Sequence, residues 1–166
     1  LRLSNNLGNQ MFMYASAFAL SKMLNRELFI DNETAYSDKR NIHKFDLDKF
    51  NISAQKAPSN FMFLGSIGYI KRKSLKYLDK VKTKKNFYIE PRDINKSTSF
   101  DKNIRKGNYN DPLFVEGHFE TEKYFNMFSD DIKNEFTFKN LTHFANNSIL
   151  KDIKSTESVS ICIRQN

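Results

Sequence analysis

The chain has 166 residues, which suffices for one ordinary domain with a buried core, and its 28% charged and 39% hydrophobic residues exclude an intrinsically disordered protein. The formal net charge of +8 indicates an anionic partner, such as a phosphorylated substrate, an acidic lipid or nucleic acid. Cys162, the only cysteine, excludes an internal disulfide. No stretch has the roughly 18 apolar residues of a membrane span and no signal peptide is recognisable, so we expect a soluble, cytoplasmic protein.

The opening residues predict a strand, a turn and a helix. Residues 1–4 are typical of a strand end, an asparagine-rich turn with Gly8 follows, and a helix is expected from about Asn9 to Asn25. Apolar residues occupy nearly every side of this helix, which indicates that it is buried against a sheet. Residues 27–31 then predict a second strand. This order is typical of an α/β fold with parallel strands.

The rest of the chain predicts shorter elements. In the first half we expect a loop over 32–40, an extended segment or short helix over 44–52, a strand or buried connection over 61–70 and an amphipathic helix over 71–85. A strand over 87–90 stopped by Pro91, a surface loop over 92–110, a buried strand over 113–119 and a turn over 120–125 should follow. The last expected elements are a helix over 130–136 capped by Ser129, a helix over 141–154 and a strand over 159–164.

The segment from Lys71 to Lys85 is the most basic part of the chain. Leu75, Leu78 and Val81 recur at helical spacing, which predicts one apolar stripe opposite a face of lysines. This basic face has two interpretations. It is either a solvated surface or a contact with anionic lipid or another polyanion.

Simple motifs give little chemistry. His43, His118 and His143 are far apart and have no carboxylate at ligand spacing, so no metal site is expected. Gly8 lacks the partner glycines of a dinucleotide fingerprint or a P-loop. The opening turn by itself is therefore only a weak candidate for a phosphate site at a helix N-terminus.

Four stretches carry a more specific pattern. Residues 6–15 read NLGNQMFMYA, residues 45–52 FDLDKFNI, residues 115–125 VEGHFETEKYF and residues 159–166 VSICIRQN. In this order they resemble the signatures of the glycosyltransferase family 11 α-1,2-fucosyltransferases: a glycine-rich turn with GNQ-M/L-F-x-Y-A, an aromatic and a leucine followed by F-x-I, G-Y-W/F-Q-S-E-K-Y-F, and the start of H-x-R-R-x-D. The matches are spread over the whole chain, which makes the combination specific.

The chain also departs from this family pattern. Asn5 and Asn6 stand where the family has glycines, His118 and Glu120 replace an aromatic and a glutamine, Cys162 stands at the histidine and Gln165 at the second arginine.

The resemblance implies an α/β, Rossmann-like domain with a parallel sheet, as in the N-terminal half of a GT-B-type glycosyltransferase. Residues 1–156 would form this acceptor-side domain, and residues 157–166 would be the first strand of a truncated C-terminal donor-binding domain. Family members are much longer, so the isolated chain is expected to be catalytically incomplete.

Enzymes of this family transfer L-fucose from GDP-fucose to the 2-hydroxyl of a galactose, with inversion and without a bound metal or other cofactor. The resemblance implies the same donor and a galactose-terminated glycan as acceptor, as in bacterial surface polysaccharide biosynthesis. The leaving diphosphate gains negative charge, which arginine and amide N–H donors would stabilise.

The resemblance also assigns residues. Arg164 would bind the donor diphosphate and Asn9 the leaving-group oxygen or the sugar, while Asn6 and Gly8 would complete the donor-binding turn, Gly8 by letting the backbone approach closely. His118 and Glu122 would face the acceptor. Plainer roles stay open: strand end for Arg164, helix N-cap for Asn9 and exposed helix face for Glu122.

Two alternatives to an active transferase remain. One is a basic module that binds nucleic acid or anionic membrane through Lys71 to Lys85, with strong salt dependence. The other is a catalytically incomplete fragment of the transferase. If the resemblance holds, nucleic acid is not an expected partner, and residues 71–85 would at most contact the inner face of the cell membrane.

Overall fold

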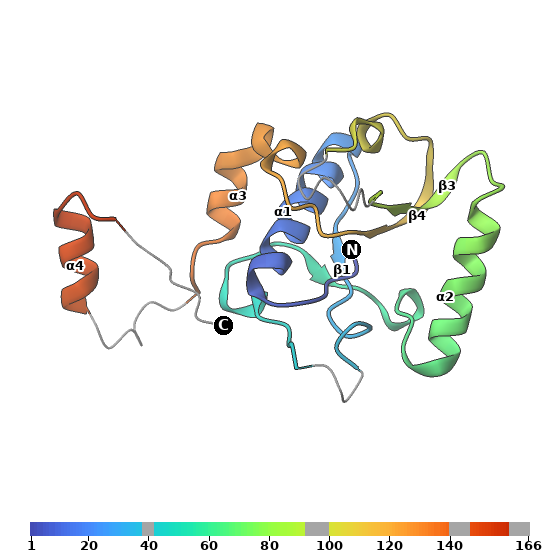
Figure 1. Ribbon diagram of the computed structural model, residues 1–166, viewed down its shortest axis with the longest axis horizontal. Coiled ribbons are helices and arrows are strands. Elements are labelled where there is room, and N and C mark those ends of the chain that lie inside the picture. Colours follow the sequence, from blue (N-terminus) through green and yellow to red (C-terminus); the bar gives the residue numbers. More distant parts are fainter. Residues whose placement is uncertain (38–41, 92–99, 140–146, 160–166) are drawn as a thin grey trace.

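The computed structural model describes residues 1–37, 42–91, 100–139 and 147–159. Within them, the chain is a mixed α/β structure with two pairs of parallel strands (Figure 1). β1 (Phe29–Ile30) pairs with β2 (Gln55–Lys56), and β3 (Lys85–Ile89) pairs with β4 (Tyr109–Glu116). The predicted α/β class with parallel strands is confirmed.

The first three residues connect the two strand pairs. Beside β1, the backbone N–H of Leu3 donates to the carbonyl of Asp31 at 3.0 Å, and that of Asp31 donates to the carbonyl of Leu1 at 2.6 Å. On the other side, the N–H of Arg2 donates to the carbonyl of Val115 in β4 at 3.1 Å. The start of the chain therefore lies in the centre of the order β2, β1, residues 1–3, β4, β3.

α1 (Leu7–Leu24) follows this central segment and runs through the middle of the molecule (Figure 1). Every residue from Met13 to Leu20 is buried, so the prediction of a helix buried on all sides is confirmed. Its start was predicted wrongly, because Asn6 rather than Asn9 caps the helix. At the other end Asn25 adopts a left-handed backbone, and its N–H bonds to carbonyls of the last turn.

α2 (Gly65–Asp79) lies along β3 at the edge of the molecule (Figure 1). The helix predicted over 71–85 therefore starts earlier and ends earlier, and residues 65–70 are helical rather than a strand or buried connection. It stops at Asp79 because that carboxylate accepts the backbone N–H groups of Asn86 and Phe87, which turns the chain back into β3. Of the predicted apolar stripe, Leu78 and Val81 are exposed and Leu75 is half-buried.

The other elements are short. They are the 3-10 helices η1 (Leu47–Lys49), η2 (Ser59–Phe61), η3 (Lys102–Arg105), η4 (Glu122–Tyr124) and η5 (Asn126–Phe128), and the α-helices α3 (Ser129–Glu135) and α4 (Asn147–Ser155). The short-helix alternative for residues 44–52 is confirmed by η1. Ser129 is not the N-cap of α3, because η5 leads directly into that helix and the backbone of Ser129 is already helical.

Several predictions reach beyond the described residues. Residues 92–99 of the predicted loop, 141–146 of the predicted helix and 160–164 of the predicted strand lie outside them. The predicted strand over 113–119 is β4, which begins at Tyr109 and ends at Glu116.

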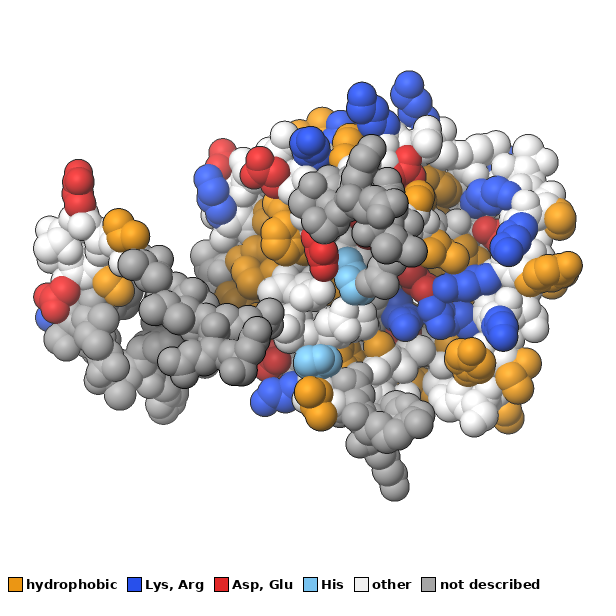
Figure 2. Space-filling view, in the orientation of Figure 1, with side chains coloured by type: hydrophobic (Ala, Val, Ile, Leu, Met, Phe, Trp, Pro, Cys, Tyr) orange, Lys and Arg blue, Asp and Glu red, His pale blue; other side chains and the backbone are white. Residues whose placement is uncertain are grey.

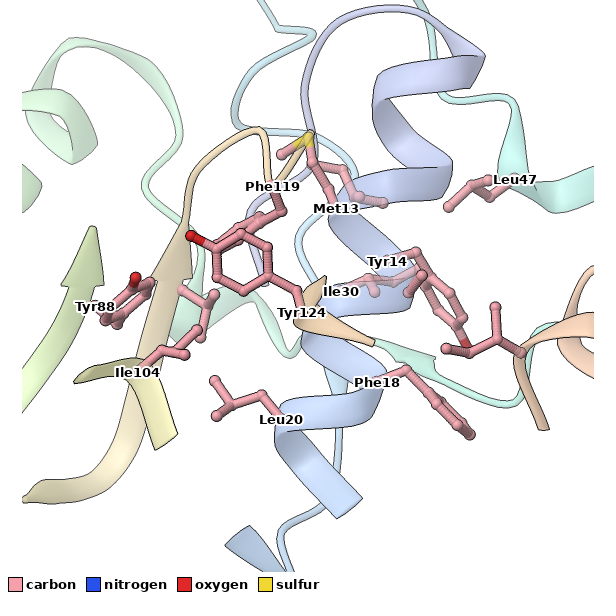
Figure 3. Close-up of a cluster of buried hydrophobic side chains, with 14 of the residues drawn as sticks. Met13, Tyr14, Phe18, Leu20, Ile30, Leu47, Tyr88, Ile104, Phe119 and Tyr124 are labelled. Atoms are coloured by element: carbon pink, nitrogen blue, oxygen red, sulfur yellow. The ribbon is translucent and has the colours of Figure 1, made fainter. Parts of the chain in front are cut away.

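An aromatic core joins α1 to the chain that follows β4 (Figure 3). Phe119 is fully buried, with its ring centroid 6.2 Å from that of Tyr88 and 5.1 Å from that of Tyr124. Tyr14 and Phe18 of α1 belong to the same cluster. Because aromatic pairs add to the stability gained by burial, this core fixes the loop after β4 against the helix.

Candidate functional site

The carboxyl ends of parallel strands share one edge of a sheet, where open α/β sheets bind their ligands. Here this edge comprises the turn Asn5 and Asn6 after the central segment, Glu90 after β3 and residues 117–120 after β4. Figure 2 views the molecule from a side on which both described histidines are visible.

Two asparagines build the turn before α1. Asn5 has a left-handed backbone with φ 64°, a conformation that asparagine tolerates better than most other residues. Asn6 is extended, and its Oδ1 accepts the N–H of Asn9 at 3.5 Å. Among the described residues, the N–H groups of Leu7 and Gly8 have no acceptor. The first turn of α1 therefore presents free donors and the positive end of the helix dipole.

Gln10 holds this turn in place. Its side chain is fully buried, and Nε2 donates to the carbonyl of Asn5 at 2.8 Å and to that of Lys44 at 2.7 Å. Its Oε1 accepts the N–H of Asp46 at 2.9 Å. One amide thus ties the turn, the helix and the segment before η1 together.

Glu90 positions the loop after β4. Its Oε2 accepts the N–H groups of His118 and Phe119, both at 2.8 Å. Phe119 has a left-handed backbone with φ 55°, which is uncommon for an aromatic residue and persists only where the surroundings determine it. The Glu90 carboxylate and the aromatic core hold Phe119 in this conformation. They therefore fix the backbone from which the neighbouring side chains of His118 and Glu120 extend.

The side chains of the turn and of this loop meet in what we name the edge cluster: Asn5, Asn9, His118 and Glu120. The Nδ2 of Asn5 lies 3.3 Å from the Nε2 of His118, whose Nδ1 lies 3.4 Å from the Oε1 of Glu120. Asn9 Nδ2 donates to the same Glu120 oxygen at 3.5 Å. The side chains of His118 and Glu120 are 31% and 48% exposed, so a ligand can reach them. An imidazole paired with a carboxylate can bind hydroxyl groups and accept a proton.

An ionic cluster lies between β4 and α2. Arg72 donates from Nε to Oε1 of Glu116 in β4 at 2.7 Å and from Nη2 to Oε2 of the same carboxylate. Lys76 Nζ donates to Oε2 at 2.5 Å. Burial would raise the pKa of Glu116, but the hydrogen bonds from Arg72 and Lys76 outweigh it and hold that pKa below its usual value. Burial, followed by repulsion from Arg72, lowers the pKa of Arg2, whose buried Nε has no partner among the described residues.

The structure brings some of the predicted site residues together and leaves others apart. Asn9 and His118 come together through Glu120. Gly8 lies exposed in the first turn of α1, with open space where a Cβ would lie, so no contact within the described structure requires glycine there. Glu122 is exposed in η4 and, among the described residues, makes no hydrogen bond or ion pair with the edge cluster. Arg164 lies outside the described residues.

A cavity next to the strands lies outside the edge cluster. This cavity of about 510 Å³ is lined by the second half of α1, residues 25–31, residues of the segment 57–63 and β4 from Asp111 to Glu116, and it includes no residue of the edge cluster. Within the described parts of the chain, no group of three or more His, Cys, Asp or Glu side chains could hold a metal ion.

Sequence reasoning did not assign Gln10 and Glu90 to the site. Gln10 stands inside the opening stretch, but only the fold shows that its amide faces inward. The position of Glu90 weakly indicates a site residue, because it lies at the end of a predicted strand, before Pro91, and ligands bind at the carboxyl ends of parallel strands.

The chain matches no family model, and comparisons with curated proteins and with solved structures find no significant match.

Proposed function

We propose that this chain is the acceptor-side part of an inverting α-1,2-fucosyltransferase that uses GDP-fucose to modify galactose in a surface polysaccharide. The observation that carries this proposal is the convergence of the motif stretches. Asn9 of the first stretch and Glu120 of the third are 111 residues apart in the sequence, yet Asn9 Nδ2 donates to Glu120 Oε1 at 3.5 Å. Gln10 of the first stretch also binds the backbone at Lys44 and Asp46, where the second stretch begins. Accidental matches would have no reason to meet at one edge of a sheet.

The departures from the family pattern support the proposal too. His118 and Glu120 replace two family residues, and they contact each other, so the two replacements form one local change. Asn5 replaces a glycine at a position whose backbone is left-handed, which is the conformation that glycine adopts most readily.

In the proposed reaction, the bond between fucose and the diphosphate breaks while the 2-hydroxyl oxygen of galactose bonds to the anomeric carbon from the opposite face. The negative charge that develops on the diphosphate is stabilised by Arg164, by the Asn9 amide and by the free N–H groups of the first turn of α1. His118, oriented by Glu120, binds the acceptor hydroxyl and takes its proton.

The proposal includes a finer fold assignment. Residues 1–156 form the Rossmann-like N-terminal half of a GT-B-type enzyme, and a donor-binding domain begins near residue 157. The parallel strand order with the first segment in the centre supports this assignment.

A donor titration tests the proposal. GDP and GDP-fucose are titrated calorimetrically, without magnesium, into residues 1–166 and into a form that continues beyond Asn166. We expect the longer form to bind both nucleotides and Arg164→Ala to abolish this binding without loss of helix signal in circular dichroism. If the longer form ignores both nucleotides, the fucosyltransferase assignment fails.

A further inference from the structure

α2 turns its polar side toward the protein. Arg72 and Lys76 point to Glu116 of β4, and Asp79 is buried against the backbone N–H groups that begin β3. Their spacing of three to four residues places them on one side of the helix. The inward side of this helix is therefore held by ion pairs and hydrogen bonds.

The opposite side of α2 is apolar and faces solvent. Ile67 is 84% exposed and Tyr77 is 73% exposed, while Ile70 and Leu78 recur at the same helical spacing and are also exposed. We name these four residues the outer stripe. Val81, just beyond the helix, is 87% exposed and extends it. An amphipathic helix in a globular protein normally buries its apolar side, so α2 is inverted relative to that pattern.

Lysines border the outer stripe and no exposed acid accompanies them. Lys71 lies along one flank and Lys73 and Lys80 along the other, as their helical spacing requires. Lys82 and Lys84 follow in the connection to β3. Asp79, the one acid from residue 65 to 85, is buried. Figure 2 shows hydrophobic and basic side chains together along the side of the molecule where α2 lies in Figure 1.

We propose that the outer stripe and its lysines dock on an anionic membrane surface, with α2 lying in the plane of the interface. Helices that bind bilayers in this way combine an apolar stripe with flanking lysines, which attract acidic headgroups while their methylene chains follow the apolar surface. α2 is at the rim of the molecule with its outer side unobstructed by other described elements (Figure 1).

Charge complementarity favours lipid over a second copy of the chain. A symmetric contact through α2 would bring the exposed lysines of both copies together with no exposed acid from the helix to compensate them. An anionic bilayer offers both an apolar layer and a continuous negative surface. This proposal does not depend on fucosyl transfer.

Vesicle flotation tests the proposal. The protein is mixed with phosphatidylcholine vesicles, with or without phosphatidylglycerol, at about 0.1 M salt. We expect binding only where phosphatidylglycerol is present, and its loss at about 1 M salt. Ile67→Ser with Ile70→Ser should weaken partitioning at least about tenfold, as should Lys71→Gln with Lys73→Gln and Lys80→Gln. These side chains are exposed, so the fold should persist.

Matched controls keep the test specific. Met127→Ser removes an exposed apolar side chain elsewhere, and Lys102→Gln with Lys106→Gln and Lys133→Gln removes the same charge elsewhere. Both controls should bind vesicles like the parent protein. Absent binding to anionic vesicles, or equal weakening by the controls and the α2 variants, would overturn the proposal. Lipid-free self-association that Ile67→Ser abolishes would also overturn it, in favour of a second copy.

Discussion

At the scale of single residues, Gln10 holds the turn of the candidate site in place. Three backbone groups from two distant segments depend on its amide. A buried group that loses its partner keeps its desolvation cost, so each of these bonds matters more than an exposed one. Gln10 therefore sets the shape of the turn from which Asn5 reaches His118 and Asn9 reaches Glu120.

We predict that Gln10→Ala lowers the free energy of unfolding by about 3 kcal/mol, or about 1 kcal/mol for each hydrogen bond lost. Urea denaturation followed by circular dichroism measures this change. Gln55→Ala, at an exposed position of β2, should stay within about 0.5 kcal/mol of the parent. A Gln10 variant as stable as the Gln55 control would show that the amide does not hold the turn.

Phe119 combines a left-handed backbone with a fully buried ring. Phe119→Ala keeps the backbone demand and removes the ring from the aromatic core, so we predict a loss of about 3–5 kcal/mol. Phe12→Ala, at a partly exposed position of α1, should cost much less. Thermal unfolding of both variants decides the question, and equal melting temperatures would contradict the packing described for Phe119.

At the scale of elements, ion pairs attach α2 to the sheet. Glu116 is their common acceptor, and its side chain is only 12% exposed. With its charged side on the sheet, α2 leaves the outer stripe facing solvent. The ion pairs also make the attachment of the helix dependent on pH.

We predict that Glu116→Gln destabilises the protein by about 2 kcal/mol at neutral pH and by little in acid. The pKa of Glu116 is lower in the folded protein than its ordinary value of 4.5. The stability that the carboxylate contributes is therefore present above the unfolded pKa and is lost as the pH falls through the folded pKa. Urea titrations of parent and variant from about pH 7 to about pH 3 measure the difference. A difference that stays constant over this range would contradict the role of the ionised carboxylate.

At the scale of the whole molecule, the first segment of the chain occupies the centre of the strand order, with α1 packed beside it. The turn between them therefore opens onto the middle of the carboxyl edge. β3 and β4 bring Glu90 and His118 to the same edge from later in the chain. Within the described residues, no helix is both long enough and apolar enough to cross a bilayer.

The sequence predicted the α/β class, the buried α1 and the opening turn, because strong local patterns determine them. It predicted α2 poorly, since its inward residues are Arg72 and Lys76, whose docking depends on Glu116 far along the chain. The contact between His118 and Asn5 also depends on strand pairing, which no local pattern encodes. The resemblance assigns Glu122 to the acceptor side, whereas Glu120 is the residue that contacts His118 and Asn9.

We propose that the edge cluster serves fucosyl transfer, and an assay of that reaction tests this directly. The form extended beyond Asn166 is incubated with GDP-fucose, a galactoside and a metal chelator, and the linkage of the product is determined by NMR. We predict an α-1,2-linked fucoside, a kcat roughly a hundred-fold lower for Asn9→Ala, and no change for Asn60→Ala at an exposed position. Absence of the fucoside, or equal rates for Asn9→Ala and Asn60→Ala, would contradict the claim.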